Sequence, residues 1–335
     1  MLGKDLIMQT LLGGGSSGGG SSGGGFPNGT EWTQSNVTSG EFRCVYNACG
    51  IWVACCNGNG LYYSNNGMEW TQSNVTSGKF QYVYNANGIW VATGSYVGIY
   101  YSNNGMEWTQ SNVTSGTFSD FYNANGIWVA AGTHPIRYSY DGVTWSNGSG
   151  TTGYLRSVYN ANGIWVAAGN DGVFFYSEDG VTWSSSDTSV GKQINDIHYA
   201  NGVWVAGING SKGIYYSMDG MTWSQSNITT VTISKLYNAN GLWLAIDSDA
   251  PYYSTDGITW TKGQGGSTGT WAYAAYSNGI WLGGRVSQNY SFDGITWEVF
   301  AKPDLSAYMA YNACGVWVFP TSTGLYYSLT WAPPA

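Results

Sequence analysis

The chain has 335 residues, of which 50 are glycine, 18 are tryptophan and 27 are tyrosine, and only 9% are charged. Disordered chains are poor in aromatic residues, so this composition excludes disorder despite the glycine. The formal net charge of −8 with 11 lysines and arginines argues against nucleic acid or an anionic membrane as partner, and no apolar run approaches the roughly 20 residues needed for membrane insertion.

The first 25 residues differ from the rest. Met1–Leu12 (MLGKDLIMQTLL) is a mildly amphipathic peptide whose apolar stretch is interrupted by polar residues, so it is a poor secretory signal. Gly13–Gly25 (GGGSSGGGSSGGG) is a Gly/Ser tether with the reach of a random coil. Two interpretations stay open. Residues 1–12 are either an expression tag or a docking peptide that grips a larger assembly.

Residues 26–335 are periodic, with a repeat of about 38 residues. Three landmarks each occur eight times: Gly-aliphatic-Trp, a Tyr-Ser pair before a turn, and a tryptophan after that turn. The first landmark ends at Trp52, Trp90, Trp128, Trp165, Trp204, Trp243, Trp281 and Trp317.

The third repeat unit illustrates the local pattern. Its β-type runs, here named strands a to d in chain order, are Phe118–Tyr122, Ile127–Ala131, Arg137–Ser139 and Val143–Trp145. The a–b turn is NANG and the c–d turn contains Asp-Gly, both strong hairpin signals. Four short strands per unit without helical periodicity predict an all-β fold of four-stranded antiparallel sheets. Their radial repetition is a β-propeller, whereas a right-handed β-solenoid would have shorter periods.

The two ends of the periodic region complement each other. The last unit contains Gly324–Ser328 but has too few residues before Trp331 for an Asp-Gly turn, so it lacks its own strand d. The fragment Asn28–Thr33 (NGTEWT) is a strand d with no strand c before it. We predict that this N-terminal strand completes the C-terminal blade and closes an eight-bladed propeller, which removes an exposed sheet edge.

The c–d hairpins SYDGVTW, SEDGVTW, SMDGMTW, STDGITW and SFDGITW resemble the Asp-box (bacterial neuraminidase repeat) hairpin, Ser-x-Asp-x-Gly-x-Thr-Trp. The resemblance extends through the repeats, with Asn-Asn-Gly in the first two, but the residue between Asp and Gly is missing. It implies a propeller hairpin whose Asp or Asn caps the turn and whose Trp packs between sheets. The family includes sialidases, other glycosidases and non-enzymatic binding proteins, so the motif alone does not specify chemistry.

An enzymatic site is not expected. Sialidases in this family hold a carboxylate with three arginines, but the four arginines here (Arg43, Arg137, Arg156 and Arg285) fall in scattered units. Only Glu41 and Glu298 are glutamates near the loops of the face opposite the turns, which leaves few candidates for a carboxylate pair. We predict no enzymatic activity, no cofactor and no metal site, with a sialidase-like glycoside hydrolase as the alternative.

Two cysteines occupy equivalent turns. Cys49 and Cys314 stand in the NACG turns of the first and last units, where other units have asparagine. A disulfide there would reinforce ring closure if the two Cα atoms came within roughly 7 Å, and two free thiols are the alternative.

The loops distinguish two faces. The a–b and c–d turns hardly vary among units, whereas the b–c loops (CCNGNG, TGSYVG, AGTHPI and so on) and the later d–a loops do. We therefore predict that one face is scaffold and that the other binds a ligand, with the middle of strand a leading into the central channel. The predicted ligand-binding residues are Tyr82, Asp120, Arg156, Asp196, Lys235 and Tyr273 from strand a, with His134 and Arg285 from b–c loops.

The function predicted from these features is a non-enzymatic binding module that recognises a glycan or a protein receptor. Residues 1–12 and the tether suggest display on a larger assembly, at a virion surface, a phage tail or another extracellular location. That arrangement loosely resembles virion-attached receptor-binding or decoration proteins. A purely structural or designed repeat scaffold is a further alternative, which the near-identical first units favour.

Overall fold

The structure is a computed structural model that describes residues 32–133, 135–266, 271–299 and 306–328. Regular secondary structure in these ranges is entirely β, in 33 strands. The described residues contain no helix of the length and hydropathy needed to cross a membrane. The predicted docking peptide, the tether and His134 lie outside these ranges.

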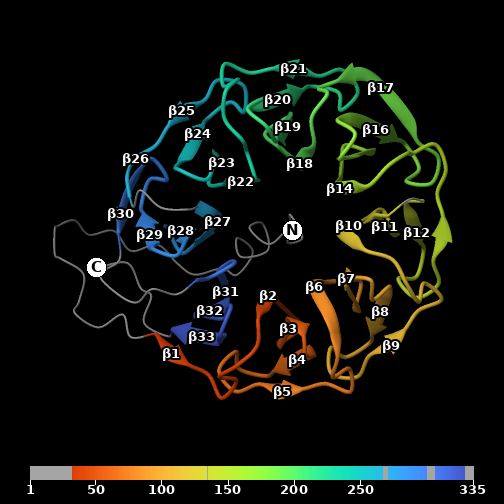
Figure 1. Ribbon diagram of the computed structural model, residues 1–335, viewed down its shortest axis with the longest axis vertical. Coiled ribbons are helices and arrows are strands. Elements are labelled where there is room, and N and C mark those ends of the chain that lie inside the picture. Colours follow the sequence, from red (N-terminus) through yellow and green to blue (C-terminus); the bar gives the residue numbers. More distant parts are fainter. Residues whose placement is uncertain (1–31, 134, 267–270, 300–305, 329–335) are drawn as a thin grey trace.

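Four antiparallel strands recur in each of eight units among the described residues (Figure 1). Strand a of units one to eight is β2 (Phe42–Ala48), β6 (Gly78–Ala86), β10 (Phe118–Ala124), β14 (Leu155–Ala161), β18 (Ile194–Ala200), β22 (Lys235–Ala239), β27 (Trp271–Ser277) and β31 (Tyr311–Ala313). Strand b is β3 (Ile51–Gly58), β7 (Ile89–Ser95), β11 (Ile127–Gly132), β15 (Ile164–Gly169), β19 (Val203–Ile208), β23 (Leu242–Ile246), β28 (Ile280–Arg285) and β32 (Val316–Thr321).

Strand c is β4 (Gly60–Ser64), β8 (Ile99–Ser102), β12 (Arg137–Ser139), β16 (Val173–Ser177), β20 (Ile214–Ser217), β24 (Pro251–Ser254), β29 (Gln288–Ser291) and β33 (Gly324–Ser328). Strand d is β5 (Thr71–Gln72), β9 (Thr109–Gln110), β13 (Ser146–Asn147), β17 (Ser184–Ser189), β21 (Ser224–Gln225), β25 (Thr261–Lys262), β30 (Thr296–Val299) and, in unit eight, β1 (Thr33–Gln34). One additional strand, β26 (Gln264–Gly265), pairs in parallel with β30.

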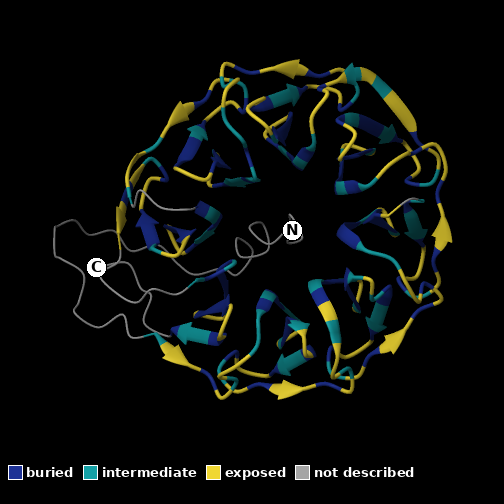
Figure 2. Ribbon diagram, in the orientation of Figure 1, coloured by how far each residue is buried: buried dark blue, intermediate teal, exposed yellow. Residues whose placement is uncertain are grey.

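The units are arranged around a common axis, with strand a innermost and strand d on the rim (Figure 1). The inner strands are mostly buried, whereas the rim strands are exposed (Figure 2). Most rim strands have only two residues, both exposed. Such short edges offer little backbone for pairing with another chain, which limits aggregation.

The last unit takes its outer strand from the other end of the chain. β1 pairs antiparallel with β33, with Thr33 opposite Tyr327 and Gln34 opposite Tyr326. The predicted strand Gly324–Ser328 is confirmed as β33. In the predicted strand Asn28–Thr33, residues 28–31 lie outside the described ranges, and β1 begins at Thr33.

Strand d begins later than its sequence suggests. In unit three the predicted Val143–Trp145 is wrong, because β13 starts at Ser146. The backbone N–H groups of Val143 and Thr144 donate to Asp141 Oδ1 at 2.8 and 2.7 Å. The N–H of Trp145 donates to the Asn112 side chain at 2.9 Å. These donors are engaged in the turn, so the strand ladder starts only after the tryptophan.

The c–d hairpin is a self-contained hydrogen-bonded box. In unit three Ser139 Oγ donates to Asp141 Oδ1 at 2.8 Å and accepts the Gly142 N–H at 2.9 Å. The Trp145 indole N–H donates to the Gly142 carbonyl at 3.2 Å, which holds the ring against the turn. Gly142 has a φ of 74°, and a Cβ there would lie 3.1 Å from the Trp128 indole nitrogen, so glycine is required.

The five box aspartates make the fold sensitive to acid. They are Asp141, Asp179, Asp219, Asp256 and Asp293. Partial burial alone would raise the pKa of each carboxyl group. Hydrogen bonds from two backbone N–H groups and a serine outweigh burial and hold each pKa below its ordinary value of 3.8. A carboxyl group with a lowered folded-state pKa stabilises the fold above its unfolded pKa, and this contribution is lost as pH falls through the folded pKa. We therefore expect Tm to be level down to about pH 5 and to fall below about pH 4.

Thermal unfolding at a series of pH values checks this expectation. Asn66 and Asn104 cap the first two boxes with the same backbone contacts that the aspartates make, so asparagine is a matched replacement. A variant with all five aspartates changed to asparagine should show a flatter acid limb. An equally steep fall in that variant would contradict the assignment.

Aromatic rings connect neighbouring units at six junctions among the described residues. The Tyr of strand a meets the Trp of strand b in the following unit, edge to face, with ring centroids 5.5–6.1 Å apart. The pairs are Tyr46–Trp90, Tyr84–Trp128, Tyr122–Trp165, Tyr159–Trp204, His198–Trp243 and, between units eight and one, Tyr311–Trp52. His198 therefore takes the place of tyrosine in this ladder.

The asparagines after strand d connect units at the rim. Asn74 accepts the Trp108 N–H at 2.8 Å and donates to the Trp108 carbonyl at 2.8 Å. Asn36, Asn112 and Asn227 make the same two-way contact with the next unit's tryptophan. The recurring Ser-Asn of these loops is therefore a connection between neighbouring units.

The five cysteines are all free. Cys49 and Cys314, for which a disulfide was one alternative, are exposed thiols at turn positions with φ of 52° each. Cys44 and Cys55 lie opposite each other on β2 and β3 and are buried.

Candidate functional site

The strand directions separate the loops onto two faces. Because each unit is antiparallel throughout, the a–b and c–d turns lie at one end of the strands, and the b–c and d–a loops lie at the other. We call the first end the turn face and the second the variable face. The b–c and d–a loops also bond to each other, as between the Asn57 N–H and the Glu41 carbonyl at 2.8 Å.

Two predicted site residues act between units inside the ring. Asp120 is 2% exposed, and its Oδ2 accepts the Val158 N–H of the next unit at 3.0 Å. Asp196 is 3% exposed, and its Oδ2 accepts the Leu236 N–H of the next unit at 2.9 Å. These hydrogen bonds explain how strand a tolerates buried carboxylates, because each one satisfies a backbone donor.

The same connection recurs with other residue types. The Ile197 N–H donates to Ser157 Oγ at 3.1 Å, and the Val45 N–H approaches the Met309 sulfur at 3.4 Å. Part of the variety along strand a therefore reflects different ways of meeting the next unit's N–H group. This explanation needs no ligand, and the sequence alone did not separate it from binding.

Three predicted residues, Tyr82, Asp120 and Arg156, lie on strand a of the consecutive units two, three and four. Burial raises the pKa of Tyr82 well above its ordinary value of 10.0, and nearby Tyr154 and Asp120 raise it further while Arg156 lowers it. The Arg156 guanidinium lies 5.7 Å from the Tyr154 ring, and its Nε donates to Asn170 Oδ1 at 2.7 Å.

The other predicted residues are spread around the ring. Tyr273 is 1% exposed and its hydroxyl donates to Gln288, so its ring faces the protein interior. Lys235 is half-buried at the start of β22. Arg285 is exposed at the end of β28, with its guanidinium 6.0 Å from the Tyr308 ring.

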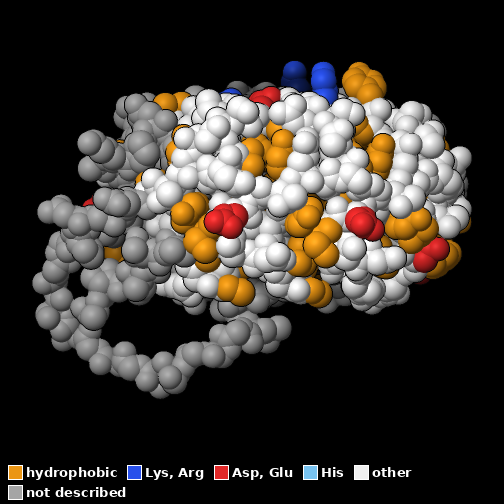
Figure 3. Space-filling model, turned by 90° about the horizontal axis from the view of Figure 1, so that it is seen from below, with side chains coloured by type: hydrophobic (Ala, Val, Ile, Leu, Met, Phe, Trp, Pro, Cys, Tyr) orange, Lys and Arg blue, Asp and Glu red, His pale blue; other side chains and the backbone are white. Residues whose placement is uncertain are grey.

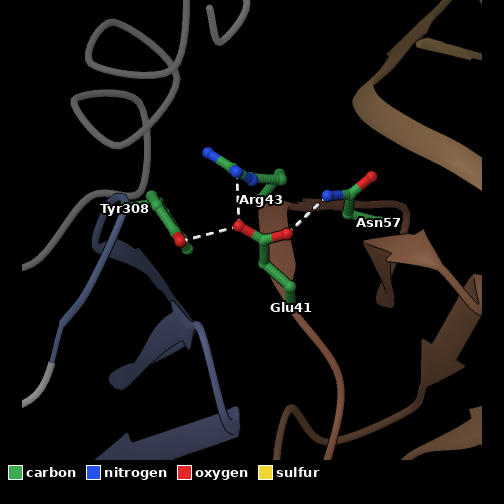
Figure 4. Close-up of polar contacts among 4 residues, drawn as sticks. All are labelled: Glu41, Arg43, Asn57 and Tyr308. Carbon is green, nitrogen blue, oxygen red and sulfur yellow. Dashed lines mark hydrogen bonds and ion pairs between the residues drawn. The ribbon is translucent and has the colours of Figure 1, made fainter. Parts of the chain in front are cut away.

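A polar cluster that was not predicted as the site lies between units eight and one, and we call it the Glu41 cluster: Glu41, Arg43, Asn57 and Tyr308 (Figure 4). Glu41 forms an ion pair with Arg43 and accepts a hydrogen bond from the Asn57 amide. The Tyr308 hydroxyl donates to Glu41 Oε1 at 2.8 Å, and the Arg43 guanidinium stacks 4.2 Å from the Tyr308 ring. The cluster therefore joins the d–a loop before strand a, strand a itself and the end of strand b in unit one to unit eight.

The cluster is half-exposed and keeps Glu41 ionised. The side chains of Arg43 and Glu41 are 35% and 28% exposed, so a ligand can reach them. Burial alone would raise the pKa of Glu41, but hydrogen bonds from Asn57 and Tyr308 and the charge of Arg43 outweigh it and lower that pKa. The site offers an ionised carboxylate, a guanidinium, an amide and an aromatic face.

The sequence analysis singles out two members of this cluster without connecting them. Glu41 is one of two glutamates near the loops of this face, and Arg43 is one of four scattered arginines. The missing signal was the contact between the first and last units, which brings Tyr308 to residues more than 260 positions away. The complementary chain ends were the one sequence feature that could have pointed there.

Charge is scarce over the rest of the molecule. The edge-on view shows a surface that is mostly neither hydrophobic nor charged, with scattered apolar side chains (Figure 3). Within the described ranges, no three His, Cys, Asp or Glu side chains are grouped so that they could hold a metal ion. Asp247 has its pKa raised by burial and by nearby Asp249, and its Oδ1 accepts the Ser248 N–H.

Comparison with known proteins identifies the fold. No family model matches the chain, and no curated protein matches it. Solved structures do: the computationally designed Ika8 protein has a TM-score of 0.71 at 9% identity and covers 88% of this chain and 98% of its own. Sqt1 from Saccharomyces cerevisiae has a TM-score of 0.67 at 8% identity, covering 88% and 96%. YCF48 bound to a D1 peptide has a TM-score of 0.56 at 14% identity, covering 90% and 96%.

These neighbours are β-propeller-like proteins. The chain folds as a β-propeller. At such low identities the likeness concerns the fold alone, and the propeller architecture hosts many unrelated functions. Function must therefore be argued from the Glu41 cluster and the variable face of this propeller.

Proposed function

We propose that this propeller is a closed, eight-bladed binding module without enzymatic activity, and that it recognises a glycan or a surface receptor through its variable face. The Glu41 cluster is the centre of the proposed site. The observation that carries the proposal is the contrast between the faces. The c–d turns of one face repeat the same hydrogen-bonded box, whereas the b–c loops of the other face differ in sequence from unit to unit. A symmetric scaffold does not require this variety, whereas an asymmetric ligand does.

Closure of the ring is supported by four contacts between the two ends of the chain. These are the pairing of β1 with β33, the Tyr311–Trp52 ring contact, the Val45–Met309 contact and the Tyr308–Glu41 hydrogen bond. The first is the pairing of strands c and d that each other unit makes internally, and the next two repeat contacts between other neighbouring units. Closure matters for function because it assembles the Glu41 cluster from opposite ends of the chain.

The state of Glu41 supports binding over hydrolysis. A glycosidase acid needs a raised pKa and a free proton to donate, whereas the pKa of Glu41 is lowered and both its oxygens are engaged. The other candidate, Glu298, accepts the Tyr290 hydroxyl in the c–d region of unit seven. Among the described residues, the Glu41 cluster includes no second carboxylate for a sialidase-like hydrolase, the alternative that the Asp-box resemblance keeps.

The ligand class is proposed from the groups that the site offers. Tyrosine faces stack on sugar rings, and carboxylate, guanidinium and amide groups bond to ring hydroxyls. A protein receptor is the second candidate, and the YCF48 propeller, which was solved with a bound D1 peptide, gives an example of peptide binding on this fold. Display on a virion, tail or cell surface through residues 1–12 is part of the same proposal. A purely structural scaffold is the remaining alternative, which the similarity to the designed Ika8 fold favours.

A glycan-array screen of the full chain, followed by calorimetry on the strongest glycan, tests this proposal. We expect Tyr308→Ala to weaken binding by about 1–3 kcal/mol, because it removes the ring between Arg43 and Arg285 and the hydrogen bond to Glu41. Asp256→Asn, on the turn face, is the matched control and should leave affinity unchanged.

Two results would count against this assignment. If Asp256→Asn lost binding while Tyr308→Ala kept it, the site would lie on the turn face and our assignment would be wrong. Release of sugar from fluorogenic glycosides, abolished by Glu41→Gln, would establish the hydrolase alternative.

A further inference from the structure

A single tyrosine projects from the variable face in a strained conformation. Tyr96 lies in the b–c loop of unit two, between β7 and β8, and is 82% exposed. Its φ is 62°, in the left-handed region that bulky L-residues rarely adopt. Strain of this kind persists only where the surroundings impose it, and it clusters at functional sites.

The neighbouring unit shows that the loop does not need this tyrosine. Units one and two share an identical stretch, YYSNNGMEWTQSNVTSG, directly after this loop. Gly98 of unit two corresponds to Gly60 of unit one. Tyr96 stands two residues before Gly98, so its equivalent in unit one is Gly58, which has a φ of 116°. Unit one thus has glycine at this position, which adopts a positive φ without strain, whereas unit two has tyrosine, which does not.

The loop around Tyr96 is held in place. The Tyr96 N–H donates to Thr117 Oγ1 of the next unit at 3.1 Å. Thr93 Oγ1 donates to the Gly98 carbonyl at 2.7 Å and closes the base of the loop. Val97 packs against the core while Tyr96 points to solvent. The ring is therefore presented by a preorganised loop and contributes little to the core.

Tyr96 lies within reach of the Glu41 cluster. Asn57, which bonds to Glu41, is opposite Lys79 on β6, and Lys79 is opposite Ser95 beside Tyr96. Two strand spacings separate Asn57 from Ser95, which is about 10 Å. A single extended ligand can therefore contact both.

We propose that Tyr96 is the stacking platform for a pyranose ring of an oligosaccharide that runs from the Glu41 cluster across unit one to unit two. The inference rests on the proposed function and names its ligand class. The exposed aromatic face stands on a polar base, because Ser95 precedes it in the chain and the Thr117 hydroxyl accepts the Tyr96 N–H, and this suits a ring with apolar C–H faces and polar edges.

The surroundings favour a glycan over a protein receptor. Of the other exposed large apolar side chains among the described residues, Tyr140, Met218 and Phe292 stand in c–d turns on the turn face, and Val286 and Val299 belong to unit seven rather than to the units around Tyr96. Tyr96 is thus an isolated aromatic in a polar setting, whereas protein interfaces have a contiguous apolar centre.

Substitution by the residue of the neighbouring unit tests the inference. On the full chain, with the strongest glycan of the array as probe, Tyr96→Gly should weaken binding by roughly tenfold or more. Its Tm should stay level or rise, because glycine relieves the positive φ. Tyr96→Phe keeps the stacking face and should bind within about threefold of the parent. Tyr140→Asn is the matched control: it replaces an exposed tyrosine of the turn face with the asparagine of units one and two.

The outcomes separate the two proposals. Equal glycan affinity of the parent and Tyr96→Gly overturns the role of Tyr96 and leaves the proposed function standing. A parent chain that binds no glycan overturns the proposed glycan recognition and this inference with it. Weaker binding of Tyr140→Asn, equal to that of Tyr96→Gly, also overturns the inference, because the loss would then not belong to the variable face.

Discussion

Deletion of residues 1–34 is expected to destabilise the propeller strongly and to cause aggregation, whereas deletion of residues 1–25 is not. The larger deletion removes β1 and exposes the backbone of β33, which then becomes an unpaired sheet edge. It also removes Trp32, whose ring meets Phe319 edge to face at 4.0 Å. Loss of a half-buried tryptophan and of the strand hydrogen bonds should cost about 3–5 kcal/mol in unfolding free energy.

Chemical denaturation and light scattering of the two deletions, compared with the full chain, measure this effect. The shorter deletion controls for removal of the predicted peptide and tether without touching β1. If the 1–34 deletion were as stable and as monomeric as the full chain, the last unit would not depend on the N-terminal strand. Ring closure by the two chain ends would then be wrong.

The repeat explains why much of the fold could be predicted. Each unit carries its own turn signals, and the Asp-Gly and Asn-Gly hairpins form within a few residues of one another. Strand d was misplaced because its start depends on a contact between units. In unit three the Trp145 N–H is taken by Asn112 of the preceding unit, and no local pattern shows this.

Contacts between units also limited the prediction of the candidate site. The sequence distinguishes a constant set of turns from a variable set of loops, and three of the predicted residues, Tyr82, Asp120 and Arg156, lie on strand a of consecutive units. It could not show that Asp120 faces a backbone N–H of the next unit, or that Tyr273 is buried. Which neighbour a side chain meets depends on the relative position of adjacent units, and this is decided by packing across the whole ring.

Substitution of Asp196 by alanine is the second change for which we expect a large effect. Its Oδ2 accepts the Leu236 N–H from unit six, and its Oδ1 accepts the Ile197 N–H at 3.0 Å within unit five. The buried Leu236 N–H loses this acceptor in the alanine variant, whereas the Ile197 N–H keeps Ser157 Oγ at 3.1 Å. An unsatisfied buried N–H group costs about 1–3 kcal/mol, so Asp196→Ala should lower the unfolding free energy by about that amount.

Asp187→Ala is the matched control, because Asp187 is an exposed aspartate on β17 and its loss changes the net charge equally. Urea unfolding should separate the two variants clearly, with the control close to the parent.

The experiment also decides whether Asp196 binds a ligand or connects units five and six. A ligand-binding carboxylate could be removed with little loss of stability, since binding sites are not optimised for folding. A connecting carboxylate destabilises the ring when it is removed, and glycan affinity then falls only to the extent that folding does. An Asp196→Ala protein that is fully stable but no longer binds glycan would show that Asp196 belongs to the binding site and does not connect the units.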